Sequence, residues 1–304
     1  MGSNSMSVPA LPLISVIAVC HNHGPYVIQT LDSIRNQTYP NIELIIINNR
    51  KDECEGIIRN WIAEQNVKCT FIQNEQAKSI SANLNYGLNH VSGVYFQGIS
   101  CDDILIKEKI EWQEIAFRNL SHDYACVYGD AVFMDSEGRI DKGLTLQERK
   151  SKKWDLAPFA QGNLQEEIST LCYIPAPTVL LRTETVRSLG GYDERLAFED
   201  WPLWMKMTNS GLKFACVSKV LVQYRILEKS LGSNNGNTDF NLSLLLFYRE
   251  NFDKMHFKHP RTFKNFFTVL KKSGLSTPSF WLLFRAVVKS RKINYSKFLI
   301  KYLL

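Results

Sequence analysis

Two pairs of adjacent acidic residues are the strongest candidates for chemistry in this sequence. Asp102 and Asp103 follow an apolar segment, and Glu199 and Asp200 precede a run of apolar and aromatic residues. Carboxylates can hold a divalent cation against a phosphate-bearing ligand, or take a proton from a hydroxyl group as it attacks another atom. Both pairs also have a purely structural interpretation, because acidic residues favour turns and helix N-termini.

The first acidic pair comes at the end of a regular alternation of strands and helices. Continuous apolar runs predict buried strands, and residues at helical spacing predict helices between them, with strands at 13–20, 42–47, 68–73 and 94–99 and helices at 26–35, 53–65 and 79–90. This alternation predicts an α/β fold with a parallel sheet, in which ligands bind beyond the carboxyl ends of the strands. Asp102 and Asp103 would lie at that edge.

The second half of the chain has a looser pattern. We expect short strands at 124–127, 131–134, 177–181, 214–217 and 220–224, and helices at 107–119, 184–189 and 198–209. The polar segment 142–165 shows no clear period and is predicted to be a mobile loop. The glycine, serine and asparagine residues at 232–237 indicate a domain boundary, and the sequence beyond them is predicted to be helical.

Composition and charge separate the chain into an acidic body and a basic tail. With 45% hydrophobic and 22% charged residues among 304, the chain is predicted to be globular, and a net charge of +6 is too mild to indicate a nucleic-acid partner. Residues 241–304 hold 13 lysine and arginine residues but only two acidic ones. We therefore expect a tag remnant at 1–10, a catalytic domain at 11–235 and a basic helical extension at 236–304.

The remaining residue types exclude several alternatives. The seven cysteines are scattered and form no C-x-x-C pair, which argues for a reducing compartment. The sequence shows no secretion signal and no apolar run of 18 residues, so the protein is predicted to be cytoplasmic. No dinucleotide-binding or P-loop motif follows the first strand. His21 and His23 lie two residues apart on a turn without a nearby cysteine or a third well-placed ligand, which argues against a zinc site, and His23 is expected to be an exposed loop residue.

An ordered series of motifs resembles family 2 glycosyltransferases of the bacterial type, which have the GT-A fold. The matching segments are 14–22, 37–39, 43–47, 84–88, 92–95, Asp102-Asp103, 190–194, Glu199-Asp200-Trp201 and Tyr224-Arg225. Each segment is short, but together they keep the family order over residues 13–233. The resemblance implies a mixed, mainly parallel sheet flanked by helices, with a helical C-terminal extension.

The resemblance also implies an activity and roles for particular residues. The chain would be an inverting hexosyl- or hexosaminyltransferase that moves a sugar from a nucleotide-diphosphate donor, taken as a UDP-sugar, to a glycan or lipid-linked acceptor in surface polysaccharide synthesis. Asp200 would be the catalytic base, Asp102 would ligate Mg²⁺ or Mn²⁺, and Glu199 and Trp201 would support the base or border the acceptor. The nucleotide would be bound by Cys20, His21, Asn22, Asn49, Asn85 and Asp103.

Three departures from the family pattern weaken the expected metal and nucleotide site. Ser100 replaces the first acid of the family's Asp-x-Asp element, Asn49 replaces an acidic residue that reads the base, and Leu227 replaces a histidine. We therefore expect weak metal affinity in the absence of donor, which Mg²⁺ tolerates because it keeps waters and uses substrate phosphates. The alternative is a non-catalytic module of the same fold that binds a nucleotide sugar or a glycan.

The basic tail has two interpretations. Its apolar and aromatic residues fall at helical spacing between lysines and arginines, which suits helices lying on an anionic membrane surface, with 281–304 the favoured segment. The same stripes could instead pack on the catalytic body and leave the cations in water. The first interpretation makes the protein peripheral on the inner face of the membrane.

Overall fold

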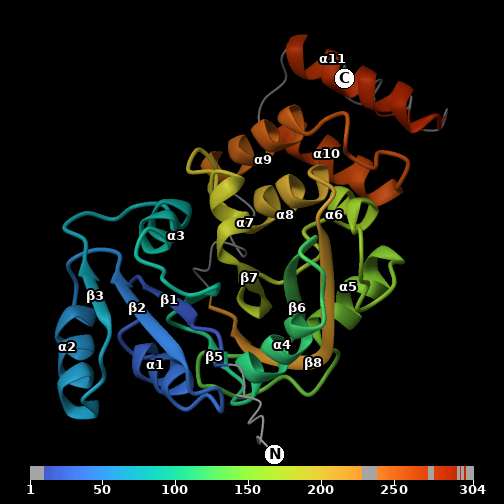
Figure 1. Ribbon diagram of the computed structural model, residues 1–304. Coiled ribbons are helices and arrows are strands. Elements are labelled where there is room, and N and C mark those ends of the chain that lie inside the picture. The colour runs from blue at the N-terminus through green and yellow to red at the C-terminus, as the bar shows by residue number, and fades with distance from the viewer. Residues whose placement is uncertain (1–9, 228–237, 273–276, 293–294, 296–297, 299–304) are drawn as a thin grey trace, which may run out of the picture.

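A mixed sheet with helices on its faces forms the centre of the molecule (Figure 1). The computed structural model describes residues 10–227, 238–272, 277–292, 295 and 298. In these ranges the sheet has eight strands in the order β3-β2-β1-β4-β7-β6-β8-β5. The predicted fold class, a mainly parallel α/β sheet flanked by helices and followed by further helices, is confirmed.

The N-terminal half forms the parallel part of the sheet, as predicted. Its elements are β1 (Ile14–Cys20), α1 (Val27–Arg35), β2 (Ile42–Asn48), α2 (Cys54–Gln65), β3 (Thr70–Gln73), α3 (Ile80–Leu88) and β4 (Tyr95–Ser100). Every residue of β1 is buried, which explains its continuous apolar run. Val19 of β1 lies beside Ile47 and Ser100 in the register, so the loops that follow three neighbouring strands start at one edge.

The C-terminal half of the sheet corrects two strand predictions. The segments predicted as separate strands are continuous in β6 (Tyr124–Met134) and β8 (Lys213–Arg225), which pair in parallel. The pairing shifts register around Asp130 instead of turning, and the preceding Gly129 has no room for a side chain because Leu221 packs against it. Shorter strands complete this half, namely β5 (Ile104–Leu105) and β7 (Leu180–Arg182).

The prediction of a mobile loop at 142–165 is wrong. This segment contains α5 (Leu146–Trp154), and α6 (Gln165–Thr170) begins at its end. Helix α5 starts with a capping box in which Thr145 and Glu148 each bond the other's backbone N–H. Only Gln147 and Trp154 of α5 are buried, so the helix has too few apolar residues to show a period. The other helices of this half are α4 (Lys109–Arg118), α7 (Thr183–Ser188) and α8 (Asp200–Asn209).

Within the described ranges, three helices follow the sheet and end far from its N-terminal strands (Figure 1). They are α9 (Thr238–Glu250), α10 (Pro260–Lys272) and α11 (Thr277–Ser290). The rings of Phe247 on α9 and Trp201 on α8 are 4.6 Å apart, and Tyr248 packs on Phe266 of α10, so these helices share a core with the body. Among the described residues, no helix combines the length and apolar character needed to cross a bilayer.

Candidate functional site

The loop that follows β4 carries the first acidic pair, and its two members differ in environment. Asp103 is only 3% exposed, and its Oδ1 accepts the backbone N–H of Arg225 at 2.8 Å. Burial and the adjacent Asp102 charge raise the pKa of Asp103 well above its usual value, although the contacts with Arg225 oppose this rise. Asp103 therefore fixes the loop from inside, while the carboxylate of Asp102 remains partly exposed.

Arg225, at the end of β8, ties this loop to the rest of the site. Its side chain is 2% exposed, and Nε donates to the carbonyl oxygen of Asp102 at 2.8 Å. Nη1 donates to the carbonyl oxygen of Asp135 at 3.0 Å, and the guanidinium lies 4.3 Å from the ring centre of Tyr26. Sequence reasoning placed Arg225 in a family segment but gave it no role. The structure shows that it positions the Asp102 loop.

The loop after β1 is held by an aspartate that sequence reasoning missed. Asp52 accepts hydrogen bonds from the N–H of Asn22 at 3.1 Å, from the amide of Asn48 at 3.0 Å and from the N–H of Cys54 at 3.0 Å. Partial burial would raise its pKa, but these hydrogen bonds outweigh burial and lower it. Asn22 has a left-handed backbone with φ of 56°, which asparagine tolerates. The available signal was an acidic residue shortly after β2.

His23 is not the exposed residue that its loop position suggested. Its side chain is 16% exposed, and Nε2 lies 3.8 Å from Oδ2 of Asp102. Nδ1 is buried, without a hydrogen-bond partner within the described part of the chain. Burial lowers the pKa of His23 against the opposing attraction of Asp102. The structure therefore brings a largely buried imidazole to the expected metal ligand.

The side chains expected to bind the nucleotide include several that are committed to internal contacts. Cys20 is fully buried, and its carbonyl oxygen accepts the N–H of Asn49 at 2.8 Å. Asn49 accepts hydrogen bonds from Asn83 at 2.7 Å and from the N–H of Lys78 at 2.8 Å, and its amide nitrogen lies 3.3 Å from Nδ1 of His21. The expected roles of Cys20, His21, Asn22 and Asn49 stay predictions, located at the carboxyl ends of β1 and β2.

Asn85 on α3 connects the nucleotide side of the site to the loop that leads toward α8. Its amide nitrogen donates to the carbonyl oxygen of Tyr192 at 3.0 Å and to Glu194 at 2.7 Å. Its carbonyl oxygen accepts the N–H of Tyr192 at 2.8 Å. These three bonds occupy both amide protons, so the structure supports a positioning role for Asn85 more directly than a contact with nucleotide.

The second acidic pair begins α8 and has an asymmetric environment. Asp200 accepts the N–H of Trp201 at 2.7 Å on one oxygen and the thiol of Cys172 at 2.9 Å on the other. Lys150 donates to the carbonyl oxygen of Cys172 at 2.6 Å and so holds that segment. Burial and the adjacent Asp200 charge raise the pKa of Glu199 to about 8. Glu199 therefore keeps its proton near neutral pH.

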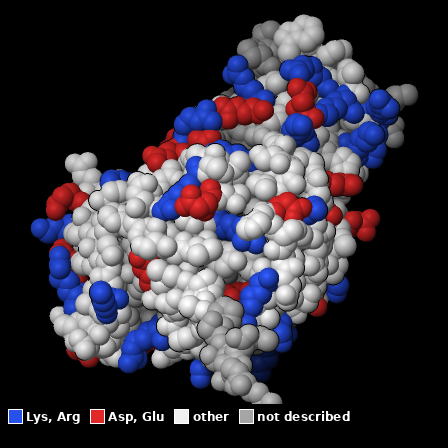
Figure 2. All heavy atoms as spheres, viewed as in Figure 1, with Lys and Arg blue, Asp and Glu red and all other residues white. Residues whose placement is uncertain are grey.

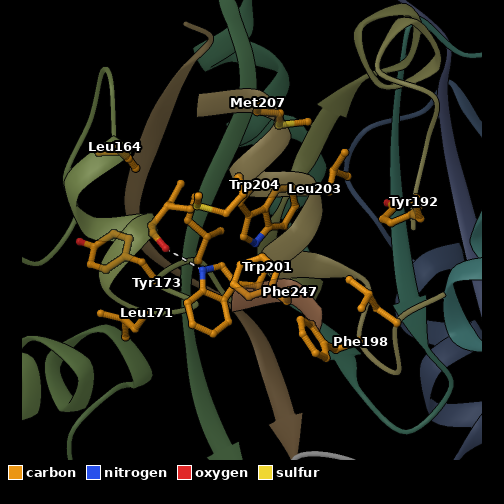
Figure 3. Close-up of a cluster of buried hydrophobic side chains, with 14 of the residues drawn as sticks. Leu164, Leu171, Tyr173, Tyr192, Phe198, Trp201, Leu203, Trp204, Met207 and Phe247 are labelled. Atoms are coloured by element: carbon orange, nitrogen blue, oxygen red, sulfur yellow. Dashed lines mark hydrogen bonds between the residues drawn. The ribbon is translucent and has the colours of Figure 1, made fainter. Parts of the chain in front are cut away.

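Trp201 serves the hydrophobic core and does not present a face to an acceptor. Its side chain points into a cluster of apolar residues with Trp204 and Phe247 (Figure 3), and it is 7% exposed. Its indole N–H donates to the carbonyl oxygen of Ile168 at 2.6 Å. A buried indole with a satisfied donor anchors α8, which fixes the position of Asp200 at the start of that helix.

The two acidic pairs lie within electrostatic reach of one phenol. Burial raises the pKa of Tyr224 on β8, and the carboxylates of Asp103, Asp102, Asp200 and Glu199 raise it further. Across the described ranges, no three His, Cys, Asp or Glu side chains converge to hold a metal ion. A cation at Asp102 would therefore depend on ligands from phosphates and water, which hard divalent cations accept.

Comparisons with known proteins agree with this architecture. The model of the family described as "Glycosyl transferase family 2" matches residues 15–183. A glycosyltransferase of Rickettsia typhi is 30% identical over 222 residues, which cover 72% of this chain and 64% of that protein. The chain thus spans just under two thirds of that relative. The O-antigen biosynthesis glycosyltransferase WbnJ of Escherichia coli is 27% identical over 274 residues, which cover 87% of this chain and 96% of that protein.

Solved structures share the fold at low sequence identity. S. aureus TarS residues 1–349, crystallised with UDP-GlcNAc, align with a TM-score of 0.63 and 16% identity over 95% of this chain and 91% of that one. The mannosyltransferase PcManGT of Pyrobaculum calidifontis, solved with GDP-Man and Mn²⁺, aligns with a TM-score of 0.58 and 14% identity over 96% of this chain and 80% of that one. The family match covers more than half of the residues and includes the Asp102 loop, so this chain belongs to glycosyl transferase family 2.

Proposed function

We propose that the protein is an inverting glycosyltransferase that moves a hexosyl or hexosaminyl group from a nucleotide-diphosphate sugar to a hydroxyl group of a glycan or lipid-linked acceptor. The observation that carries this proposal is that the carboxylates of Asp102 and Asp200 both act on the phenol of Tyr224 and raise its pKa. Asp102 lies in the loop after β4, at the edge where the strands β1, β2 and β4 end. One carboxylate can serve the diphosphate side of a donor and the other the acceptor side. Family membership supports the same division of roles.

In the proposed reaction Asp200 takes the proton of the acceptor hydroxyl as its oxygen attacks the anomeric carbon. The bond from that carbon to the diphosphate breaks on the opposite face, which inverts the configuration. Glu199 keeps its own proton near neutral pH and leaves the basic oxygens to Asp200. Asp102 would hold Mg²⁺ or Mn²⁺, whose positive charge would neutralise the leaving diphosphate.

The substrates are proposed from relatives. TarS was solved with UDP-GlcNAc and PcManGT with GDP-Man and Mn²⁺, which supports a nucleotide-sugar donor and a divalent cation. We propose a UDP-sugar, because TarS was solved with UDP-GlcNAc, although the amide oxygen of Asn49 already accepts hydrogen bonds from Asn83 and Lys78 and is not free to accept one from a uracil imide. The name of WbnJ refers to O-antigen biosynthesis, which supports a surface polysaccharide as the product.

Helix α11 supports a peripheral membrane association on the inner face. The apolar stripes of α9 and α10 pack on the body, but Trp281, Phe284 and Val288 of α11 are 57%, 41% and 61% exposed. Lys and Arg side chains gather at this end of the molecule (Figure 2), although Lys289 of the same helix donates to the carbonyl oxygens of Phe252 and Asp253 and Arg285 pairs with Asp253. Exposed aromatic residues beside cations suit an interface with anionic lipid.

A vesicle assay tests the membrane proposal. Wild-type protein should pellet with vesicles that contain phosphatidylglycerol and not with phosphatidylcholine alone. The triple substitution Trp281→Ser, Phe284→Ser and Val288→Ser should abolish pelleting, whereas Ile115→Ser, at a 47% exposed position on α4, should leave it unchanged. Equal pelleting of all three proteins would refute a contact through α11.

A donor panel tests the catalytic proposal against a binding module. The wild-type protein is incubated with Mn²⁺, UDP-, GDP- and dTDP-sugars and candidate glycan or lipid-linked acceptors, and release of the nucleoside diphosphate is measured. We expect acceptor-dependent release from one nucleotide class. Donor binding by calorimetry without release from any donor would favour the alternative, a non-catalytic module that binds a nucleotide sugar or a glycan.

A further inference from the structure

An open cavity lies between α9 and α11, outside the proposed catalytic site and at the end of the molecule far from the N-terminal strands (Figure 1). Its volume is about 330 Å³, and the described residues that line it are Arg249 of α9 and Trp281, Leu282 and Arg285 of α11. Two guanidinium groups therefore share one space with an indole ring and a leucine side chain. Such a lining suits a ligand that has both a negative charge and an apolar part.

Both arginines keep donors that the polypeptide leaves unused. Among the residues that the structure describes, the exposed Arg249 has no hydrogen bond or ion pair. Nη2 of Arg285 lies 3.6 Å from Oδ1 of Asp253, and both side chains are more than half exposed, so this pair is weak. The guanidinium of Arg285 also lies 4.6 Å from the ring centre of Phe252. A ring that covers the face of a guanidinium leaves its in-plane N–H groups available to an anion.

The contacts that hold α11 explain why the cavity stays open. Lys289 donates to the carbonyl oxygens of Phe252 and Asp253 at 3.0 and 2.6 Å, which fixes α11 on the turn after α9. Leu283 and Ala286 are fully buried and form the packed face of the helix. The residues that line the cavity lie beside this face, so they are positioned by the packing without taking part in it.

Apolar surface adjoins the cavity on both helices. Trp281 is 57% exposed and lies on the same side of α11 as Phe284 and Val288, the residues proposed to meet the membrane. Leu242 of α9 is 49% exposed and precedes Arg249 by seven residues, which places both on one side of that helix. The arrangement of cations beside apolar side chains matches a lipid, whose phosphate adjoins its hydrocarbon chains.

We propose that this cavity binds the phosphate headgroup of an anionic bilayer lipid between Arg249 and Arg285. The inference rests on the membrane contact of the proposed function and deepens it, since it adds a defined site to a general attraction. A guanidinium donates two parallel N–H bonds to phosphate oxygens, which a lysine cannot do. The charge of the segment is complementary to such a ligand, because residues 241–304 hold 13 lysine and arginine residues and two acidic ones.

Titration of the full chain with dihexanoylphosphatidylglycerol, kept below its critical micelle concentration, tests the site without a membrane. By calorimetry, Arg249→Gln and Arg285→Gln should each weaken binding at least about tenfold. Lys264→Gln removes the same charge from an exposed position on α10 and should change the affinity by less than about twofold. The lipid should also change the tryptophan emission of the wild type, and Trp281→Phe should abolish this change. Dihexanoylphosphatidylcholine, which has the same chains but no net charge, should bind more weakly.

Several results would overturn the site. Equal losses in Arg249→Gln, Arg285→Gln and Lys264→Gln would show general charge attraction, and so would an emission change that survives in Trp281→Phe. Either result would leave the vesicle contact of α11 and the transferase function standing. Inorganic phosphate that binds as tightly as the lipid would overturn the choice of a lipid, and tighter binding of farnesyl phosphate would assign the cavity to a lipid-linked acceptor. Failure of the wild type to pellet with any vesicle would refute the membrane contact and the bilayer lipid together.

Discussion

Replacing Arg225 by methionine removes the side chain that holds the Asp102 loop. The contacts of this side chain give the expected loss in the free energy of unfolding. The guanidinium makes four hydrogen bonds, two of them to acceptors of exposed residues that water can reach again. The remaining contributions are the bonds to the carbonyl oxygens of Asp102 and Asp135 and the positive charge beside the buried Asp103 carboxylate. At about 1 to 1.5 kcal/mol each, these three contributions predict a loss of about 3 to 4.5 kcal/mol in the free energy of unfolding.

Urea unfolding at pH 7.5, followed by circular dichroism and tryptophan fluorescence, measures this loss. Arg139→Met is the matched control, because Arg139 pairs with Asp135 at 2.7 Å on the surface, where such pairs contribute about 1 kcal/mol or less. The reasoning is refuted if Arg225→Met loses no more stability than Arg139→Met. Coincident transitions by both probes are needed, because the estimate assumes two-state unfolding.

Two other substitutions test the surroundings of the proposed base. In wild type, Glu199 keeps its proton up to about pH 8 when folded but ionises near 4.5 when unfolded, so this residue makes the free energy of unfolding fall as pH rises between these values. In Glu199→Gln that decline should be absent from urea titrations at a series of pH values, and parallel curves for the two proteins would contradict the raised pKa. Cys172→Ala removes a donor from Asp200 and should lower kcat roughly fivefold, as expected for one hydrogen bond of about 1 kcal/mol. Cys172→Ser keeps a donor and should recover most of the loss in steady-state assays, so equal kcat for both variants would count against the contact.

The parallel half of the sheet could be predicted because burial leaves a direct mark on the sequence. All seven residues of β1 are buried, so the strand reads as a continuous apolar run. Helix α5 could not be found in the same way, since only two of its nine residues are buried and its one local signal is the capping box of Thr145 and Glu148. The glycine before Asp130 suggested a turn, but it accommodates Leu221 within a strand that shifts register.

In the site, residues that belong to local motifs could be predicted from the sequence, whereas residues that act through long-range contacts could not. Asp102 and Asp200 belong to short motifs, so their positions could be predicted, although their roles stay proposals. Arg225 lies 122 residues from the carboxylate that its backbone N–H bonds, and Cys172 lies 28 residues from the carboxylate that it bonds. The spacing of apolar residues along the sequence carries no information about pairs that lie so far apart. The burial of His23 depends on how its loop packs, which a single sequence does not show.

The central claim is that Asp200 is the base of a sugar transfer, and its amide variant tests this most directly. Asp200→Asn keeps an acceptor oxygen for Cys172 or for the N–H of Trp201 but cannot take a proton from a hydroxyl group. With the donor identified by the panel, kcat should fall by a factor of about 10² to 10⁴, while the Kd for that donor stays within about threefold of wild type. Wild-type turnover in a folded Asp200→Asn variant would contradict the account.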